Sequence, residues 1–560
     1  MAFSISKRLF EVEEKKINVI VFFLLAGYLC LGISHIAMLP PWEGFDETAH
    51  YSYLQQIADT GKLPRQKKAR ISQDVENYTL FAPVPYSSNP PMQNNGGYTY
   101  KAFFKLSSEI MNIGYDYVKS KPDKPRFFTE GRSINWQSQQ PPLYYLLLSP
   151  IYFMTRHLSW GEEIFILRLI SYLFAWSAIL IGIYSFQQKS VNNPSLCWAI
   201  IGITLWPILF PSWFPAMARL GNDSLCALIM ALIWFFLVKS SVEKISIKYS
   251  IIIGLLLGLG CITKAFFVPV SVGILSFYCF RFWMYEKIEF HKIIYYLSVA
   301  IICIIGVSGW WYFANWYQYG VLIGSDEMIA LYDAGGFSKF IINNFQINKW
   351  IRGCLAFITT LSWCSSWSWA RPPYMYLAPM VLIVFVVFIS YAISLRGLNK
   401  KSVFWLPLWC LLPVLLGFSF HVLIRIALTS EGRGTSGYYL NFMIVPLGTA
   451  LGSGFYRMWK NRTFKIMVII LSLYAIILSI TTIWAQVLLF SGIIYKADTS
   501  KFYQLPEIMP PSLGLSEAFT KLKIISFPYI GISMLIIGSI MLIIGLPLLW
   551  RFSNQLKRAT

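Results

Sequence analysis

The stretch "INVIVFFLLAGYLCLGISHIAMLPPWEGFDETAH" (17–50) decides the fold class, because a long apolar run ends abruptly in a proline pair and a cluster of ionisable residues. The run Ile17–Leu39 is long enough to cross the hydrocarbon core of a bilayer, which takes about 20 helical residues. Pro40 and Pro41 stand where a cleaved signal peptide would carry small residues. The sequence therefore predicts a retained signal anchor.

The composition of the whole chain is also typical of a membrane protein. Of its 560 residues, 56% are hydrophobic and 17% aromatic, while only 13% are charged. A soluble protein carries about 25% charged residues. Because apolar runs of transmembrane length recur, we predict an all-α polytopic membrane protein.

Hydropathy predicts a bundle of about 12 transmembrane helices and a large first extracytoplasmic loop that carries juxtamembrane helices. The spans are expected at 17–39, 163–186, 196–215, 223–239, 249–263, 265–281, 293–313, 374–395, 403–428, 437–456, 465–490 and 524–549. The regions are then a cytoplasmic N-terminus (1–16), the first helix (17–39), an outer loop (40–162), helices within 163–313, an outer loop (314–373), helices within 374–490, an outer loop (491–523), the last helix (524–549) and a cytoplasmic tail (550–560).

The charge distribution orients this topology. The net charge is +21, from 47 Lys and Arg against 26 Asp and Glu. Basic clusters such as "RMWKNRTFK" (457–465) fall on one set of loops, and cytoplasmic loops carry such an excess. Both termini are therefore predicted to be cytoplasmic, and the basic balance does not indicate nucleic acid as a partner.

The segment "QQPPLYYLLLSPIYFM" (139–154) is apolar but too short to span after its prolines. Counting it as a span would invert every later loop and break the charge pattern. We therefore predict a re-entrant or interfacial segment at 139–156.

Nine cysteines are scattered without the spacing of a metal site. Cys354 and Cys364 are the best candidates for a disulfide, since their loop is predicted to face an oxidising compartment.

Asp46, Glu47 and His50 form the first candidate site, on a predicted helix that ends near Gly61. Four residues apart, Asp46 and His50 share a helix face. Asp46 as a helix cap, with Glu47 in the first turn, is one alternative. A divalent metal bound by the three residues is another. Ionisable groups close to hydrocarbon are costly and tend to mark function.

An ordered set of motifs resembles the GT-C superfamily of membrane glycosyltransferases. "DE" (46–47) and "AH" (49–50) follow the first span and its proline pair. The later motifs are "QQPPLYYLLLSPIY" (139–152), "RLIS" (168–171), "ARLGNDSLCAL" (218–228), "GLGCITKAFFVPV" (258–270), "GWWYFANWYQYG" (309–320), "SSWSWARPPYMY" (365–376) and "EGRGTSGYYLNFMIVPL" (431–447). In one departure from the pattern of relatives, "GTSG" separates Arg433 from the tyrosine pair that follows.

The nearest resemblance is to bacterial members without an assigned substrate, and aminoarabinose lipid A transferases and protein O-mannosyltransferases are more distant. The resemblance implies a GT-C-like fold in a bacterial cytoplasmic (inner) membrane. It also implies transfer of a sugar from an undecaprenyl-phosphate-like donor to an envelope glycan, lipid or protein acceptor on the outer side, among membrane lipids and without a cofactor.

This chemistry needs a base for the acceptor proton and cations for the leaving lipid phosphate. We expect Asp46 to be the base, with Glu47 as second choice or helper. The expected phosphate ligands and other substrate-binding residues are Arg219, Lys264, Arg371, Arg433, His50 and Tyr144. The plain alternative for a cation at a span end is a snorkelling anchor.

Two other functions compete with this hypothesis. An envelope polysaccharide polymerase or ligase would rely on outer arginines without an acidic pair at the first membrane exit. A transporter or flippase of a lipid-linked precursor would bury charges at mid-span and show repeat symmetry.

Overall fold

The computed structural model describes residues 2–85, 97–190, 194–240, 246–282, 289–336, 345–368, 372, 374–396, 402–429, 434–493 and 515–559. Long helices dominate these residues, and a two-stranded antiparallel sheet is the one sheet among them. The predicted all-α class is confirmed.

Eight helices in the described ranges are long and apolar enough to cross a membrane. They are α1 (Ala2–Met38), α7 (Trp160–Ser190), α10 (Asp223–Ser240), α13 (Phe290–Tyr319), α17 (Tyr374–Leu395), α18 (Leu406–Thr429, preceded by η3, Val403–Trp405), α20 (Arg462–Phe490) and α22 (Pro528–Ala559). Each coincides with a predicted span, so the chain is a multi-pass membrane protein.

The other four predicted spans contain shorter helices. These are α8 (Pro194–Leu209), α11 (Ile247–Cys261), α12 (Phe267–Arg281) and α19 (Ile444–Met458). A helix as long as α11 rises only roughly 22 Å, against about 30 Å of hydrocarbon. The segment between α8 and α10 (210–222) and the turn after α11 both supply residues to the site described below.

Glycines allow the closest helix contacts. A Cβ on Gly538 of α22 would lie 3.0 Å from the carbonyl oxygen of Gly27 on α1, so the first and last long helices pack backbone to backbone. A Cβ on Gly254 of α11 would lie 2.6 Å from the carbonyl oxygen of Ala300 on α13. Without side chains at these points, neighbouring backbones approach each other and pack tightly.

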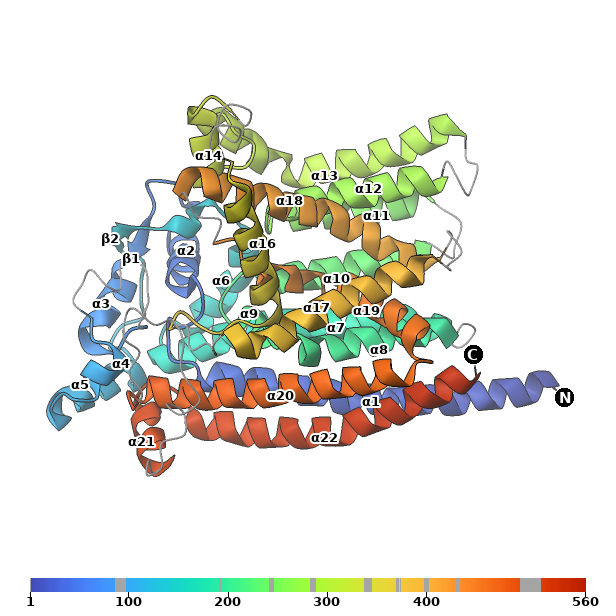
Figure 1. Cartoon of the computed structure of the whole chain (residues 1–560). Helices are drawn as coiled ribbons and strands as arrows, with labels where there is room; N and C mark the ends of the chain where they lie inside the picture. The colour runs from blue at the N-terminus through green and yellow to red at the C-terminus, as the bar shows by residue number, and fades with distance from the viewer. Residues whose placement is uncertain are drawn as a thin grey trace.

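The segment between α1 and α7 folds into a small layer at one end of the bundle (Figure 1). It contains α2 (Glu47–Thr60), β1 (Arg70–Ser72), α3 (Gln73–Phe81), α4 (Tyr100–Phe103), α5 (Ser108–Lys119), β2 (Glu130–Ile134), η1 (Trp136–Gln139) and α6 (Leu143–Thr155). Strand β1 pairs antiparallel with β2, with Arg70 opposite Ile134. The helix α6 falls in the predicted segment 139–156 and packs against α2.

Figure 1 shows both chain ends at the opposite end of the bundle from this layer. The remaining elements are α9 (Trp213–Met217), α14 (Asp326–Asp333), α16 (Ile347–Ser362), η4 (Gly437–Met443) and α21 (Leu515–Ile525). The helix α16 runs across the direction of the long helices and contacts η4. The side of the membrane on which each end lies stays a prediction.

The candidate cysteine pair does not form a disulfide. Cys354 lies within α16 and Cys364 just beyond its end, and both are free thiols. The Cys364 thiol is buried and donates to the carbonyl oxygen of Ser212 over 3.5 Å.

Candidate active site

Asp46 lies in the turn between α1 and α2 with a left-handed backbone, at φ 62° and ψ 11°. This conformation costs an L-residue about 1 kcal/mol. The side chain occupies the cap position of α2 but makes no capping hydrogen bond. Helix capping therefore does not account for Asp46, and strain of this kind gathers at functional sites.

Trp136 of η1 fixes the carboxylate of Asp46. Its indole N–H donates to Oδ1 of Asp46 over 2.8 Å. Among the described residues, Oδ2 accepts no hydrogen bond from a side chain or backbone group. Burial raises the pKa of the Asp46 carboxyl, while Arg219, the Trp136 N–H and Lys264 oppose that shift. The result is a partly buried carboxylate with one oxygen available and a greater affinity for a proton.

Glu47, the neighbouring acid, has both oxygens engaged and is fully buried. Arg168 of α7 donates from Nε to Oε1 over 2.7 Å and from a terminal nitrogen to Oε2 over 2.6 Å. The backbone N–H groups of Gly44 and Leu220 donate over 3.0 Å each. A Cβ on Gly44 would lie 2.3 Å from the Glu47 carboxyl carbon, so glycine is required there. Glu47 therefore holds the turn in place beside Asp46.

Arg168 is a residue whose role the sequence reading missed. Besides Glu47, it donates to the carbonyl oxygens of Leu39 (2.6 Å) and Pro40 (2.8 Å), the last residues before the turn. A lone arginine inside the apolar run of α7 was a usable signal, because charges in such runs are costly and functional.

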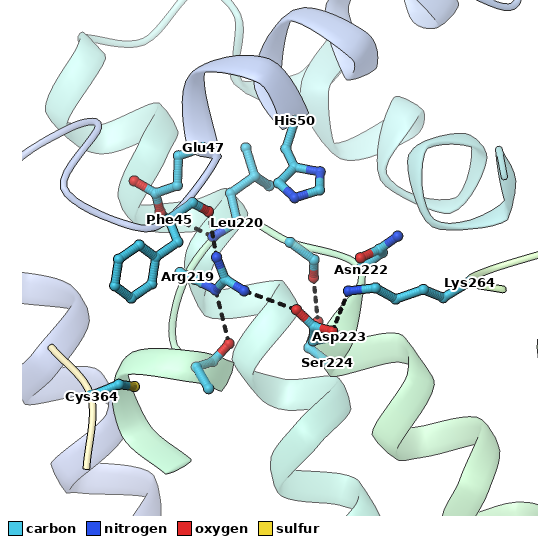
Figure 2. Close-up of polar contacts among 12 residues, drawn as sticks. Phe45, Glu47, His50, Arg219, Leu220, Asn222, Asp223, Ser224, Lys264 and Cys364 are labelled. Atoms are coloured by element: carbon cyan, nitrogen blue, oxygen red, sulfur yellow. Dashed lines mark hydrogen bonds and ion pairs between the residues drawn. The ribbon is translucent and has the colours of Figure 1, made fainter. Parts of the chain in front are cut away.

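Asp223 brings two of the predicted cations together at the start of α10. Arg219 donates to its Oδ2 over 2.9 Å, and the Lys264 ammonium donates to its Oδ1 over 2.5 Å. Figure 2 shows Arg219 and Lys264 reaching Asp223 from opposite sides, with His50 above them on α2. All three side chains of this group are at most 9% exposed. One carboxylate between two cations leaves a net charge of +1, and we call these three residues the cation cluster.

The two cations of the cluster have N–H donors that no described residue accepts. Arg219 also donates to the carbonyl oxygens of Ala216 (3.1 Å) and Phe45. A guanidinium has five N–H groups and an ammonium three, so about two remain on each cation. Unused donors on buried cations favour an anionic partner.

Aromatic rings line the cation cluster. The Tyr438 ring centroid lies 5.3 Å from the Arg219 guanidinium, and the Tyr439 centroid lies 4.5 Å from the Lys264 ammonium. Phe45 stacks on Tyr438 with centroids 5.4 Å apart. The predicted span 437–456 thus begins with the 3-10 turn η4, which places both tyrosines at the site instead of in a membrane helix.

His50 faces the cation cluster from α2. Its Nδ1 is 2.8 Å from the hydroxyl of Tyr145 on α6. Burial, together with Arg219 and Lys264, lowers the pKa of His50 well below its usual value, so the ring is neutral at pH 7. Nε2 has no hydrogen-bond partner among the described residues and lies near Gly221.

Tyr144 and Asn222 hold the segment that carries Arg219. The Tyr144 hydroxyl pairs with Ser171 over 2.6 Å and accepts the N–H of Gly221 over 2.9 Å. Asn222 donates to Gln140 and to the carbonyl oxygen of Thr263, which precedes Lys264. These contacts hold the backbone next to Arg219 and Lys264.

Two predicted residues, Arg371 and Arg433, lie outside the described residues. A metal on Asp46, Glu47 and His50 is not supported, because no group of three such side chains in the described ranges is placed to hold an ion. Glu47 is directed to Arg168 instead.

Comparison with known proteins was made by family, sequence and structure. No protein family and no curated sequence matches the chain. Among solved structures, ArnT from Cupriavidus metallidurans bound to undecaprenyl phosphate is similar, with a TM-score of 0.37, 10% identity, and coverage of 82% of this chain and 76% of that chain. An Archaeoglobus fulgidus oligosaccharyltransferase tethered to an acceptor peptide has a TM-score of 0.42 and 13% identity over 86% of this chain and 56% of its own.

Similarity at these scores carries no functional argument, so the proposal below rests on the residues of the site.

Proposed function

We propose that the protein is a membrane glycosyltransferase that moves a sugar from a polyprenyl-phosphate donor to an acceptor hydroxyl or similar nucleophile outside the cytoplasmic membrane. The observation that carries this proposal is that Asp46, with one oxygen that accepts no hydrogen bond from the described residues, lies within electrostatic reach of the buried cation cluster of Arg219, Asp223 and Lys264. A base and an anion-binding group are the two elements that such a transfer requires.

The cation cluster suits a lipid phosphate. Its net charge of +1 and unused N–H groups complement a phosphodiester, which carries a single negative charge. Because Arg219 and Lys264 are already held by Asp223, little reorganisation is needed when the anion binds. Their burial strengthens the electrostatic interaction relative to water.

The reaction follows from this arrangement. The bond between the anomeric carbon and the phosphate oxygen breaks, and its electron pair leaves with the lipid phosphate. The acceptor oxygen forms the new bond to the anomeric carbon and loses its proton to Oδ2 of Asp46. The positive charge of Arg219 and Lys264 stabilises the negative charge that develops on the phosphate.

The acceptor class that we propose is an envelope glycan, lipid or protein, as the sequence resemblance implies. The rings of Tyr438 and Tyr439, which cover the cations, provide flat faces against which a sugar can lie. His50 and the unpaired Oδ1 of Asn222 are polar groups at the same place, suited to sugar hydroxyls.

The test is a transfer assay with purified full-length protein in lipid nanodiscs, supplied with radiolabelled polyprenyl-phosphate sugars and an envelope extract as acceptor. We expect transfer that falls about 10²- to 10⁴-fold in Asp46→Asn. A polymerase or ligase would keep most of its activity in this variant, and a flippase would move the donor across liposomes without transferring the sugar. Either result would overturn the proposal.

A further inference from the structure

Glu43, three residues before Asp46, is a fully buried carboxylate that the reaction above does not use. Tyr100 of α4 donates its hydroxyl to Oε1 of Glu43 over 2.7 Å. Ser368 donates its hydroxyl to the same oxygen and its backbone N–H to Oε2 over 3.1 Å. The carbonyl oxygen of Glu43 accepts the N–H of Trp367 over 2.9 Å. One residue thus joins three segments that are far apart in the sequence.

Unlike Glu47, Glu43 has no ion-pair partner among the described residues. A buried carboxylate is costly unless hydrogen bonds compensate it, and the described donors to Glu43 are neutral hydroxyl and N–H groups. Burial raises the pKa of Glu43, and the bonds from Ser368 and Tyr100 oppose that shift. The contribution of the Glu43 side chain is therefore this set of hydrogen bonds.

The contacts of Glu43 continue to the catalytic turn through Phe45. The Phe45 ring packs edge-to-face on Trp367 with centroids 5.3 Å apart and stacks on Tyr438. The carbonyl oxygen of Phe45 accepts from Arg219. The backbone just before Asp46 is therefore held between the segment 365–368 and the cation cluster.

We infer that Glu43 is a positioning residue for the proposed transfer: its hydrogen bonds to Tyr100 and Ser368 dock the segment 365–368 on the turn and keep Asp46 in its left-handed conformation beside the cation cluster. Glu43 before Asp46 and Glu47 after it hold the two sides of the turn. This inference rests on the proposed function, and it adds that the second predicted outer loop takes part in placing the base.

Activity measurements distinguish positioning from direct chemistry. In Glu43→Ala we expect kcat to fall about 10- to 100-fold, because a small displacement of a reacting group has an effect of this size. KM for the lipid donor stays unchanged, because the cation cluster is intact. Glu43→Gln, which has the same length and can still accept the Ser368 N–H, restores most of the lost kcat. If Glu43→Gln is as inactive as Glu43→Ala, the carboxylate takes a direct part and the inference is wrong.

A milder substitution keeps the inference testable if Glu43→Ala fails to fold. Tyr100→Phe removes one donor to Glu43 and should lower kcat about fivefold, the effect of one neutral hydrogen bond. The matched control is Tyr51→Phe, which removes a hydroxyl bonded to another buried carboxylate, Glu163, over 3.0 Å. It should change the melting temperature and leave kcat unaltered. Equal losses of kcat in both tyrosine variants would overturn the inference.

Hydrogen exchange tests the inference without an activity assay. Amides of residues 44–50 and of Trp367 and Ser368 should exchange faster in Glu43→Ala than in the unmodified protein, while Tyr51→Phe leaves them protected. Unchanged exchange in these two segments would overturn the docking role of Glu43. If the unmodified protein transfers no sugar, the proposed function fails, and this measurement still decides whether Glu43 holds the turn.

Discussion

The indole N–H of Trp136 donates to one carboxylate oxygen of Asp46 over 2.8 Å, across 90 residues of sequence. Among the residues that the structure describes, the second oxygen of Asp46 accepts no hydrogen bond, and the Trp136 bond stabilises the ionised form of the carboxyl. Together with the left-handed backbone of Asp46, it fixes the direction in which a base at this position acts.

Replacing Trp136 with phenylalanine should move the acid limb of the pH–rate profile. The pKa of Asp46 is raised by burial, and the Trp136 bond counteracts part of that rise. Without the donor, the pKa rises further, so activity is lost at a higher pH as the solution is made more acidic. The measurement is kcat/KM against pH, with Trp176→Phe as control, since the Trp176 indole donates to Leu25 within the bundle. An unshifted acid limb would show that Asp46 is not the titrating base.

Asp46→Asn should be more stable than the unmodified protein at neutral pH. A raised pKa means that the folded state binds the proton more tightly, so stability falls as the pH rises through the interval between the unfolded and folded pKa values. Asparagine removes this penalty and tolerates the left-handed backbone. Melting temperatures in detergent should differ at pH 7 and converge below about pH 4, the ordinary range of an aspartate. A less stable variant at pH 7 would contradict this account.

Lys264→Met should weaken donor binding. Asp223 keeps Arg219 as a partner, so no unpaired charge is created, but one charge-assisted contact to the phosphate is lost. Such a contact contributes about 1.5–3 kcal/mol, or about 10- to 100-fold in the dissociation constant. Native mass spectrometry with undecaprenyl phosphate measures this effect. The control is Lys119→Met, which removes a partly buried lysine bonded to Ser526. Equal affinity in the two variants would exclude Lys264 as a phosphate ligand.

Glu47→Gln should lower the stability of the folded protein, because it leaves the Arg168 guanidinium buried without its counter-charge. Breaking a buried pair costs about 3–5 kcal/mol. Adding Arg168→Met to this variant should recover part of the loss, as read from thermal unfolding. If Glu47→Gln melts normally yet transfers no sugar, Glu47 itself takes part in the reaction.

Site residues that lie only a few positions apart in the sequence could be predicted to lie together in the structure. His50 lies on α2, and Asp46 stands at the cap position just before that helix, so short spacing was enough to bring these two together. Asp223, which joins Arg219 to Lys264, was not among the predicted site residues. The apolar runs gave the eight long helices because hydrocarbon thickness fixes their length.

Contacts between distant segments could not be read in this way. Nothing local to Trp136 indicates that it bonds to Asp46, and nothing local to Tyr100 indicates Glu43. The role of Glu47 was equally hidden, since its partner Arg168 is 121 positions away. Tyr438 and Tyr439 were placed in a membrane span, because an apolar run does not reveal that its first turn is a 3-10 segment facing the site.

The most direct test of the central claim is a cryo-electron microscopy structure of Asp46→Asn in nanodiscs with a polyprenyl-phosphate sugar bound. The account predicts phosphate oxygens within about 3 Å of both Arg219 and Lys264, with the anomeric carbon facing residue 46. A donor phosphate bound elsewhere in the bundle, with residue 46 turned away from the sugar, would contradict it.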